Sequence, residues 1–189
     1  MLAEHLRQKG RRVCLSREPG GSSLGGELRS VLLDSTRDLD SWAELFLYLA
    51  DRAQHMQEVI SPALRAGELV IIDRFVDSTL AYQGEARGLG LDRVLEMSQL
   101  ATHGIQPELT ILLDLDVQTG LTRARSRNAL QAAHQEAKFE DQDLQFHRKV
   151  RQAYLELASR YPYRIRILDA RGEPEQVLAR VLLALGLEA

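Results

Sequence analysis

Charged and small polar side chains follow one short apolar run of the chain. The run, 69–72, is rich in β-branched residues, and Asp73 and Arg74 come directly after it. If the run is a buried strand, it delivers a carboxylate and a guanidinium to the edge of a sheet where ligands bind in open α/β folds. The planar fork of an arginine suits a phosphate, because it donates two charge-assisted hydrogen bonds. A structural ion pair at a strand end is the alternative interpretation.

Three further strand-like runs also end in charged residues. They are 11–18 with Arg17 and Glu18, 109–116 with Asp114 and Asp116, and 164–168 followed by Asp169. In a parallel sheet these ends meet at one edge. Arginines around an anion, with a carboxylate free for a hydrated cation, are what phosphoryl transfer needs, because that chemistry is mostly positioning and charge stabilisation. Magnesium takes one or two carboxylates plus substrate oxygens.

A second source of arginine lies in the segment 123–127. Arg123 and Arg127 are four residues apart and share a helical face, and Arg125 lies between them. A polar segment without clear periodicity follows. The pattern fits a mobile flap that closes over a polyphosphate and excludes water. A solvated helix face is the alternative.

An aromatic residue and an arginine are paired in the same way earlier in the chain. Tyr48 and Arg52 are spaced i and i+4 in a long predicted helix. One side of that helix could present a ring for stacking and a guanidinium for the carbonyl of a base. The alternative is an amphipathic rim residue beside a surface arginine. The five histidines cluster neither with the single cysteine nor with one another, so a zinc site is not expected.

Strands and helices alternate along the chain. Predicted strands cover 11–18, 69–73, 109–116 and 164–168, and predicted helices cover 1–9, 24–33, 41–60, 91–102, 117–127, 139–161 and 174–185, with a short helical start at 77–82 and a glycine-rich loop at 84–90. This alternation indicates a parallel sheet with helices on both faces. We therefore predict one doubly wound α/β domain over residues 1–189.

Composition narrows the class of protein. The chain has 189 residues, a net charge of −3 and one cysteine. The acidic balance argues against a general binder of nucleic acid or membrane surfaces, which would be basic. No apolar run approaches the ~20 residues of a membrane span, and the first residues have no signal-peptide core. A cytoplasmic protein without an intrachain disulfide is expected.

Five segments carry a family signature: Arg17–Gly21 (REPGG), Ala50–Gln54 (ADRAQ), Asp73–Gly84 (DRFVDSTLAYQG), Pro107–Asp114 and Phe146–Ala158. Through them the chain resembles the bacterial thymidylate kinases nearly end to end. The resemblance implies a doubly wound sheet of the P-loop nucleoside monophosphate kinase type. It implies transfer of a phosphoryl group from ATP, with Mg²⁺, to thymidine monophosphate, for thymidine triphosphate synthesis. It also implies a homodimer packed through long helices.

The resemblance further implies roles for single residues. Arg74 would hold the 5′-phosphate and Asp73 would lie beside the magnesium ion and the phosphates. Tyr48 matches the ring that stacks on thymine, and Arg52 the arginine that contacts a base carbonyl. Other matched substrate-binding residues are Ser78 and Thr79 at the base edge, Tyr82 and Gln83 on the deoxyribose and base side, and Glu18 and Arg29 near the phosphate and sugar.

The implied lid departs from the family pattern. Arg123, Arg125 and Arg127 resemble its start and join Asp73 and Arg74 as expected catalytic residues, with the lid at about 123–140. The family commonly continues into Asp-Arg-[Phe/Leu]-Glu, whereas this chain reads AKFE at 137–140. The lysine there keeps a positive charge but lacks the two-pronged fork of arginine.

The front of the chain departs further. Family members begin with the central strand of the sheet and a phosphate-binding loop, but no G-x-x-x-x-G-K-[ST] motif occurs in this sequence. Two interpretations stay open: a shortened record of a working kinase, or a truncated homologue that only binds nucleotide or dimerises. A kinase for another nucleoside monophosphate and a nucleic-acid-binding module are further alternatives, and the acidic balance disfavours the second.

Overall fold

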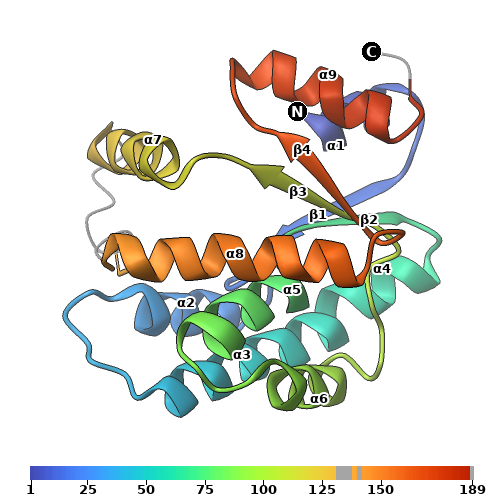
Figure 1. Ribbon diagram of the computed structural model, residues 1–189. Helices are drawn as coiled ribbons and strands as arrows, with labels where there is room; N and C mark the ends of the chain where they lie inside the picture. Colours follow the sequence, from blue (N-terminus) through green and yellow to red (C-terminus); the bar gives the residue numbers. More distant parts are fainter. Residues whose placement is uncertain (131–137, 140–141, 188–189) are drawn as a thin grey trace.

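Four short strands form the centre of the molecule. The computed structural model describes residues 1–130, 138–139 and 142–187. Strand β1 (Val13–Arg17) pairs in parallel with β2 (Leu69–Asp73), and β3 (Thr110–Asp114) pairs in parallel with β4 (Ile165–Asp169). Each predicted strand is thus confirmed, with ends that differ by a few residues (Figure 1).

The register of the strands brings their charged ends together. Arg17 lies opposite Asp73, and Asp114 lies opposite Asp169. Among the described residues β2 pairs only with β1 and β3 only with β4, so the strands form two separate two-stranded sheets. The predicted edge of polar side chains therefore exists, divided between two half-sheets.

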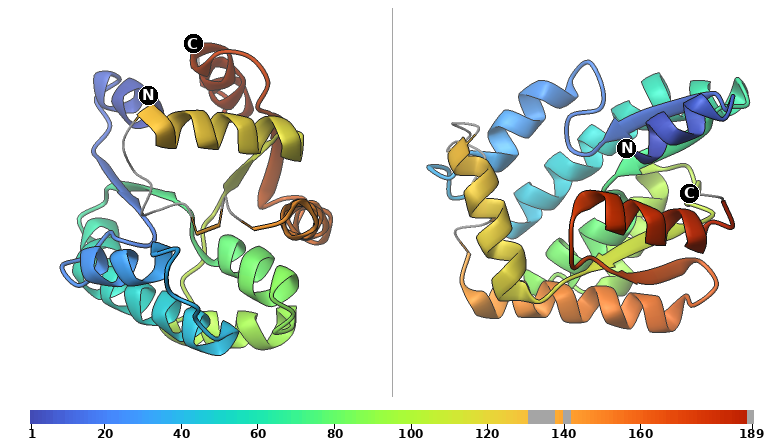
Figure 2. Two further views of the ribbon diagram at one scale, coloured as in Figure 1. Left: turned by 90° about the vertical axis from the view of Figure 1, so that its left-hand side faces the viewer. Right: turned by 90° about the horizontal axis from the view of Figure 1, so that it is seen from above.

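Helices cover the strands from two sides. They are α1 (Leu2–Gln8), α2 (Gly25–Leu33), α3 (Ser41–His55), η1 (Met56–Ile60), α4 (Ser61–Arg65), α5 (Val76–Thr79), η2 (Leu80–Ala86), α6 (Leu91–Ala101), α7 (Val117–Leu130), α8 (Leu144–Arg160) and α9 (Pro174–Ala184). Figures 1 and 2 show α1 and α9 on one side of the strands and α2, α3, α5 and α6 on the other. The predicted α/β class with parallel strands is confirmed. No helix in the described part of the chain is long and apolar enough to span a membrane.

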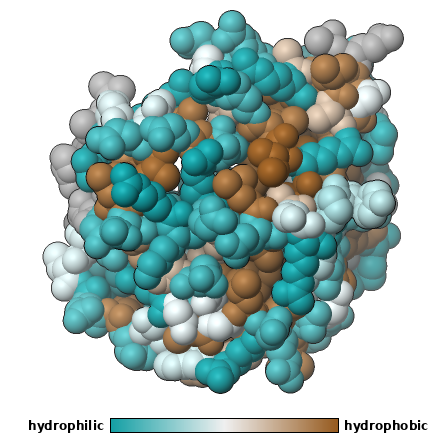
Figure 3. Space-filling view, viewed as in Figure 1, coloured by the Kyte–Doolittle hydropathy of each residue, from teal (hydrophilic) through white to brown (hydrophobic). Residues whose placement is uncertain are grey.

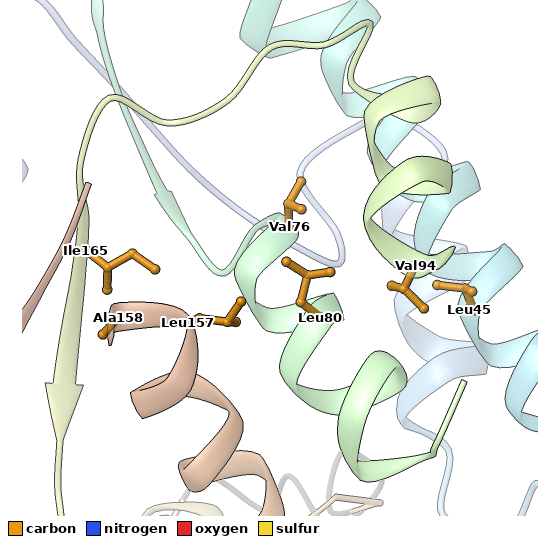
Figure 4. Packing of buried hydrophobic residues seen from close by; sticks show 7 residues of the cluster. All are labelled: Leu45, Val76, Leu80, Val94, Leu157, Ala158 and Ile165. Atoms are coloured by element: carbon orange, nitrogen blue, oxygen red, sulfur yellow. The ribbon is translucent and has the colours of Figure 1, made fainter. Parts of the chain in front are cut away.

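The main hydrophobic core lies between the strands and the second group of helices. Figure 4 shows its members, which come from α3, α5, η2, α6, α8 and β4: Leu45, Val76, Leu80, Val94, Leu157, Ala158 and Ile165. Full burial of one large aliphatic side chain stabilises a fold by about 1.5–3 kcal/mol. This core therefore fixes α3 against the α5–η2 segment, and those elements carry most of the predicted substrate-binding residues.

Some apolar side chains of the strands stay uncovered. Leu15 in β1, Leu113 in β3 and Ile167 in β4 are 47–55% exposed. Figure 3 shows an apolar surface between α9 and α8, in the region where Figure 1 places the strands. The half-sheets are thus incompletely packed within the described residues.

Two predicted boundaries were wrong, and one predicted helix keeps its bounds but changes its winding. The segment 84–90 is a loop only in its second half, because η2 continues to Ala86 and packs against α6; a Cβ added at Gly84 would lie 3.2 Å from Leu91. The helix expected over 41–60 becomes a wide π turn after His55. The helix expected from 139 begins at Leu144, because the Asp143 carboxylate caps it by accepting from the Phe146 amide at 2.7 Å.

Candidate active site

The turn after β2 presents a carboxylate and a guanidinium, as the sequence predicts. Asp73 and Arg74 are both exposed. Arg74 has a φ of +66°, a conformation that costs a non-glycine residue energy and turns the chain sharply toward α5. Its guanidinium lies 5.2 Å from the centre of the Tyr82 ring. The guanidinium of Arg74 is a cation at every ordinary pH, and the neighbouring Tyr82 phenol raises its pKa further.

A buried ion pair connects Glu18, directly after β1, to α3. Arg52 Nε donates to Glu18 Oε2 at 2.8 Å, and His55 Nδ1 lies 2.9 Å from Glu18 Oε1. Both Glu18 oxygens are therefore occupied by protein groups. In this arrangement Glu18 orients Arg52, and its predicted place beside the substrate phosphate and sugar stays a prediction.

Arg52 has one donor left over. Its Nη2 donates to Thr79 Oγ1 at 2.9 Å, and its guanidinium lies 5.2 Å from the centre of the Phe75 ring. Its Nη1 is buried without a hydrogen-bond partner among the described residues. A buried donor without a partner costs about 1–3 kcal/mol, and a carbonyl oxygen of a ligand would satisfy it.

The base-side residues lie on two facing helical segments. Tyr48 is one turn from Arg52 on α3, and burial raises the pKa of its phenol. On the facing segment Thr79 binds Arg52, and the Gln83 amide donates to Glu44 at 2.9 Å. The structure thus brings these predicted residues together around Tyr48.

Helix α8 supports the site from another direction. The Tyr154 hydroxyl donates to Ser78 Oγ at 2.7 Å, and burial raises the pKa of Tyr154 to about 12. The rings of Tyr82 and Phe139 meet edge to face, with centroids 5.3 Å apart. Sequence reasoning missed Tyr154, Glu44 and His55; the four-residue intervals from Glu44 to Tyr48 and from Tyr48 to Arg52 could have indicated Glu44.

The Pro19–Gly21 turn packs closely on the same network. Arg29 of α2 donates through Nη1 to the Pro19 carbonyl at 3.0 Å, and the Asp51 carboxylate accepts from the Gly20 amide at 3.2 Å. A Cβ at Gly21 would lie 2.4 Å from His55 Nε2, so a larger residue would displace that ring. Arg29 is thereby placed beside the turn that carries Glu18.

The predicted lid arginines lie on α7. Arg123 donates to the carbonyls of Ala170 at 3.1 Å and Gly172 at 3.3 Å, in the loop after β4. Arg125 is exposed. The side chain of Arg127 and residues 131–137 and 140–141 of the predicted lid lie outside the described residues. The described contacts of Arg123 join it to that loop and include none with Arg74.

Asp73 is the residue that could hold a metal. Among the described residues no three or more histidine, cysteine or acidic side chains gather as a metal cluster. The Asp73 carboxylate makes no hydrogen bond or ion pair there and lies at the open end of β2. One such carboxylate fits Mg²⁺ that is bound mainly through substrate phosphates and water.

Comparison with known proteins identifies relatives of this chain. A family model described as thymidylate kinase matches residues 1–181. The thymidylate kinase of Syntrophotalea carbinolica is 49% identical over 183 residues, which are 96% of this chain and 85% of that protein. The thymidylate kinase of Solidesulfovibrio magneticus is 50% identical over 182 residues, 95% of this chain and 87% of that protein. The crystal structure of the thymidylate kinase from Ehrlichia chaffeensis superposes with a TM-score of 0.76 and 28% identity, covering 97% of this chain and 87% of that one. The fold is therefore of the P-loop nucleoside monophosphate kinase type, and the chain belongs to the thymidylate kinase family.

Proposed function

We propose that this protein transfers a phosphoryl group from ATP to thymidine monophosphate, giving thymidine diphosphate. The family and its relatives at about half identity support this reaction. The observation in the structure that carries it is the buried Nη1 of Arg52, which has no hydrogen-bond partner in the described part of the chain and lies one helical turn from Tyr48. A donor fixed beside an aromatic ring suits a pyrimidine that stacks on the ring and offers a carbonyl oxygen.

The acceptor nucleotide occupies the space between α3 and the α5–η2 segment. Tyr48 stacks on the base and Arg52 donates to its carbonyl. Arg74, held as a cation at the end of β2, binds the 5′-phosphate. The remaining contacts come from Ser78, Thr79 and Gln83 around the base, from Tyr82 beside the sugar, and from Arg29 and Glu18 toward the phosphate.

The donor side rests on charge. Asp73 would hold Mg²⁺ together with phosphate oxygens, and the ion, when bound, would neutralise charge on the transferring group. Arg123, Arg125 and Arg127 of α7 form part of a lid over about 123–140 that supplies further positive charge. The chain's own residues thus orient the nucleotides and exclude water, with no covalent step on the protein.

An inactive homologue that only binds nucleotide or dimerises is the second candidate. Two observations favour it: the sequence has no G-x-x-x-x-G-K-[ST] motif, and β2 and β3 do not pair with each other in the described part of the chain. The lack of a central strand and phosphate loop stays a prediction. DNA upstream of the Met1 codon that encodes in frame a strand and this motif would decide for the kinase.

The reaction is tested by coupled measurement of ADP release. The purified protein receives MgATP with thymidine, deoxyuridine or uridine monophosphate in parallel. Turnover with thymidine monophosphate in preference to the others supports the proposal. Binding of thymidine monophosphate without ADP release favours the second candidate. If the protein neither binds thymidine monophosphate nor releases ADP, both candidates are refuted.

We also propose that the protein works in the cytoplasm as a homodimer, with small nucleotides and no nucleic acid as partners. The family resemblance supports the dimer, and the acidic charge disfavours nucleic acid. Sedimentation equilibrium at micromolar concentration gives the mass directly. A mass near that of one chain would contradict the dimer.

A further inference from the structure

A buried carboxylate that was not among the predicted site residues binds three side chains. Glu44 on α3 is 0% exposed. Its Oε1 accepts from Gln83 Nε2 at 2.9 Å, and its Oε2 accepts from Arg87 Nη2 at 3.1 Å and lies 3.7 Å from Lys138 Nζ. Two cations thus surround this carboxylate, and one neutral amide completes the group.

Glu44 also lies on the same face of α3 as the predicted base-binding residues. Glu44, Tyr48 and Arg52 follow one another at four-residue intervals, so they lie along one face of α3 with a rise of about 6 Å between neighbours. The facing segment carries Thr79 and Gln83, also four residues apart. Arg52 binds Thr79 and Glu44 binds Gln83, so two hydrogen bonds flank Tyr48, one on each side.

The charge of Glu44 determines how the Gln83 amide is turned. An ionised carboxylate beside two cations only accepts hydrogen bonds, and therefore the NH₂ group of Gln83 must face it. The Gln83 carbonyl oxygen then points away from Glu44. Gln83 is 2% exposed, so the protein, rather than solvent, sets this orientation.

We propose that Glu44 is a positioning residue that fixes the Gln83 amide with its carbonyl oxygen toward the nucleobase. The inference rests on the proposed function, because it takes Tyr48 as the surface on which the base stacks. Thymine offers an N3–H donor between two carbonyl oxygens, which matches an acceptor from Gln83 and a donor from Arg52. Cytosine has an unprotonated N3 and an amino group at the corresponding positions, so the same pair of side chains opposes it.

Equilibrium binding measures the effect without any need for turnover. Titration calorimetry gives the Kd of thymidine and deoxycytidine monophosphate for the unaltered chain and for Glu44→Gln. A glutamine at this position can offer either its oxygen or its NH₂ group to Gln83, which frees that amide to turn. We expect thymidine monophosphate to bind about tenfold more weakly, as for the loss of one buried hydrogen bond, and its preference over deoxycytidine monophosphate to fall.

A double-mutant cycle separates positioning from general support of the fold. In a Gln83→Ala background, Glu44→Gln should change neither affinity by more than about twofold, because its target is gone. Arg87→Lys is the matched control: it loses the hydrogen bonds of Arg87 Nε and Nη2 to the same carboxylate but leaves an acceptor-only group facing Gln83. It should keep the base preference. Glu44→Asp replaces Glu44→Gln if the latter does not fold, since it keeps the charge but withdraws the acceptor from Gln83.

Each outcome has a distinct meaning. An unchanged base preference in a folded Glu44 variant overturns the inference. So does an equal loss of base preference in Arg87→Lys, or a further loss of affinity when Glu44→Gln is added to Gln83→Ala. No binding of thymidine monophosphate by the unaltered chain refutes the proposed function first. Loss of preference confined to the Glu44 variants supports the positioning role.

Discussion

Replacing Glu18 with glutamine tests the buried network from which the site is built. The side chains of Arg52 and Glu18 are 1% and 2% exposed, so water cannot replace a lost partner. Glu18→Gln keeps the size of the side chain but removes its charge. In the native structure Arg52 and His55 each approach one Glu18 oxygen. The NH₂ group of the new glutamine must therefore face one of these two side chains and cannot accept its hydrogen bond.

The expected loss of stability is large. Removing one partner of a buried ion pair costs about 3–5 kcal/mol, because the remaining charge is left uncompensated. For a chain of this size each kcal/mol lowers Tm by about 2–4 °C, which gives a decrease of about 10 °C. Affinity for thymidine monophosphate should fall about tenfold as well, since Arg52 loses the contact that orients it.

Thermal unfolding followed by circular dichroism, and calorimetric binding, measure both effects. Asp34→Asn is the control, because it breaks an ion pair with Arg37 that is largely exposed; its Tm should change by no more than about 2 °C. A Tm of Glu18→Gln within about 3 °C of the unaltered chain would refute the buried-pair reasoning. An unchanged affinity in a destabilised variant would refute the orienting role of Glu18 alone.

Two further predictions concern buried titratable groups. Asp51→Asn should raise Tm at pH 8 but not near pH 4. Burial raises the pKa of Asp51, so the folded protein is destabilised by the charged carboxylate only at pH values above that pKa. A lower Tm of the variant at pH 8 would contradict this. Tyr154→Phe should lose less stability than the unaltered chain between pH 10 and 12 in denaturant titrations. With its pKa raised to about 12, Tyr154 keeps its proton in the folded state over a pH range in which the unfolded state releases it. An equal loss of unfolding free energy per pH unit in both proteins would count against this.

Much of the fold could be predicted because its signals are local. The apolar runs ending in charged residues identified the four strands of the described residues, and their parallel pairing follows from the helices between them. The ends of helices were less predictable, because they depend on single contacts such as the Asp143 cap and the approach of Leu91 to Gly84. The residues in those contacts belong to no periodic hydrophobic pattern that the sequence would reveal.

The grouping of the predicted substrate-binding residues was partly visible in the sequence, and the residues that support them were much less so. Tyr48 and Arg52 share a face by their spacing, which the sequence shows directly. The partners that hold such residues are distant in sequence: Glu18 is 34 residues from Arg52, and Ser78 is 76 residues from Tyr154. A buried carboxylate such as Glu44 looks like any surface glutamate until the packing of α3 on η2 is known.

The proposed acceptor side of the site is held by contacts of its own, which leads to a last prediction. Its contacts join α3, α5, η2 and the turn after β1, and the link between Tyr154 and Ser78 adds α8. None of them requires a phosphate-binding loop. Thymidine monophosphate at 100 times its Kd should therefore stabilise the 189-residue chain by about 2.7 kcal/mol, a rise in Tm of about 5–11 °C. If the chain is instead the inactive homologue, the second candidate, ATP should give a much smaller shift and ADP release should be absent, whereas the proposed kinase should release ADP. Turnover at an ordinary kinase rate, or a shift with ATP as large as that with thymidine monophosphate, would refute the inactive homologue and support the kinase.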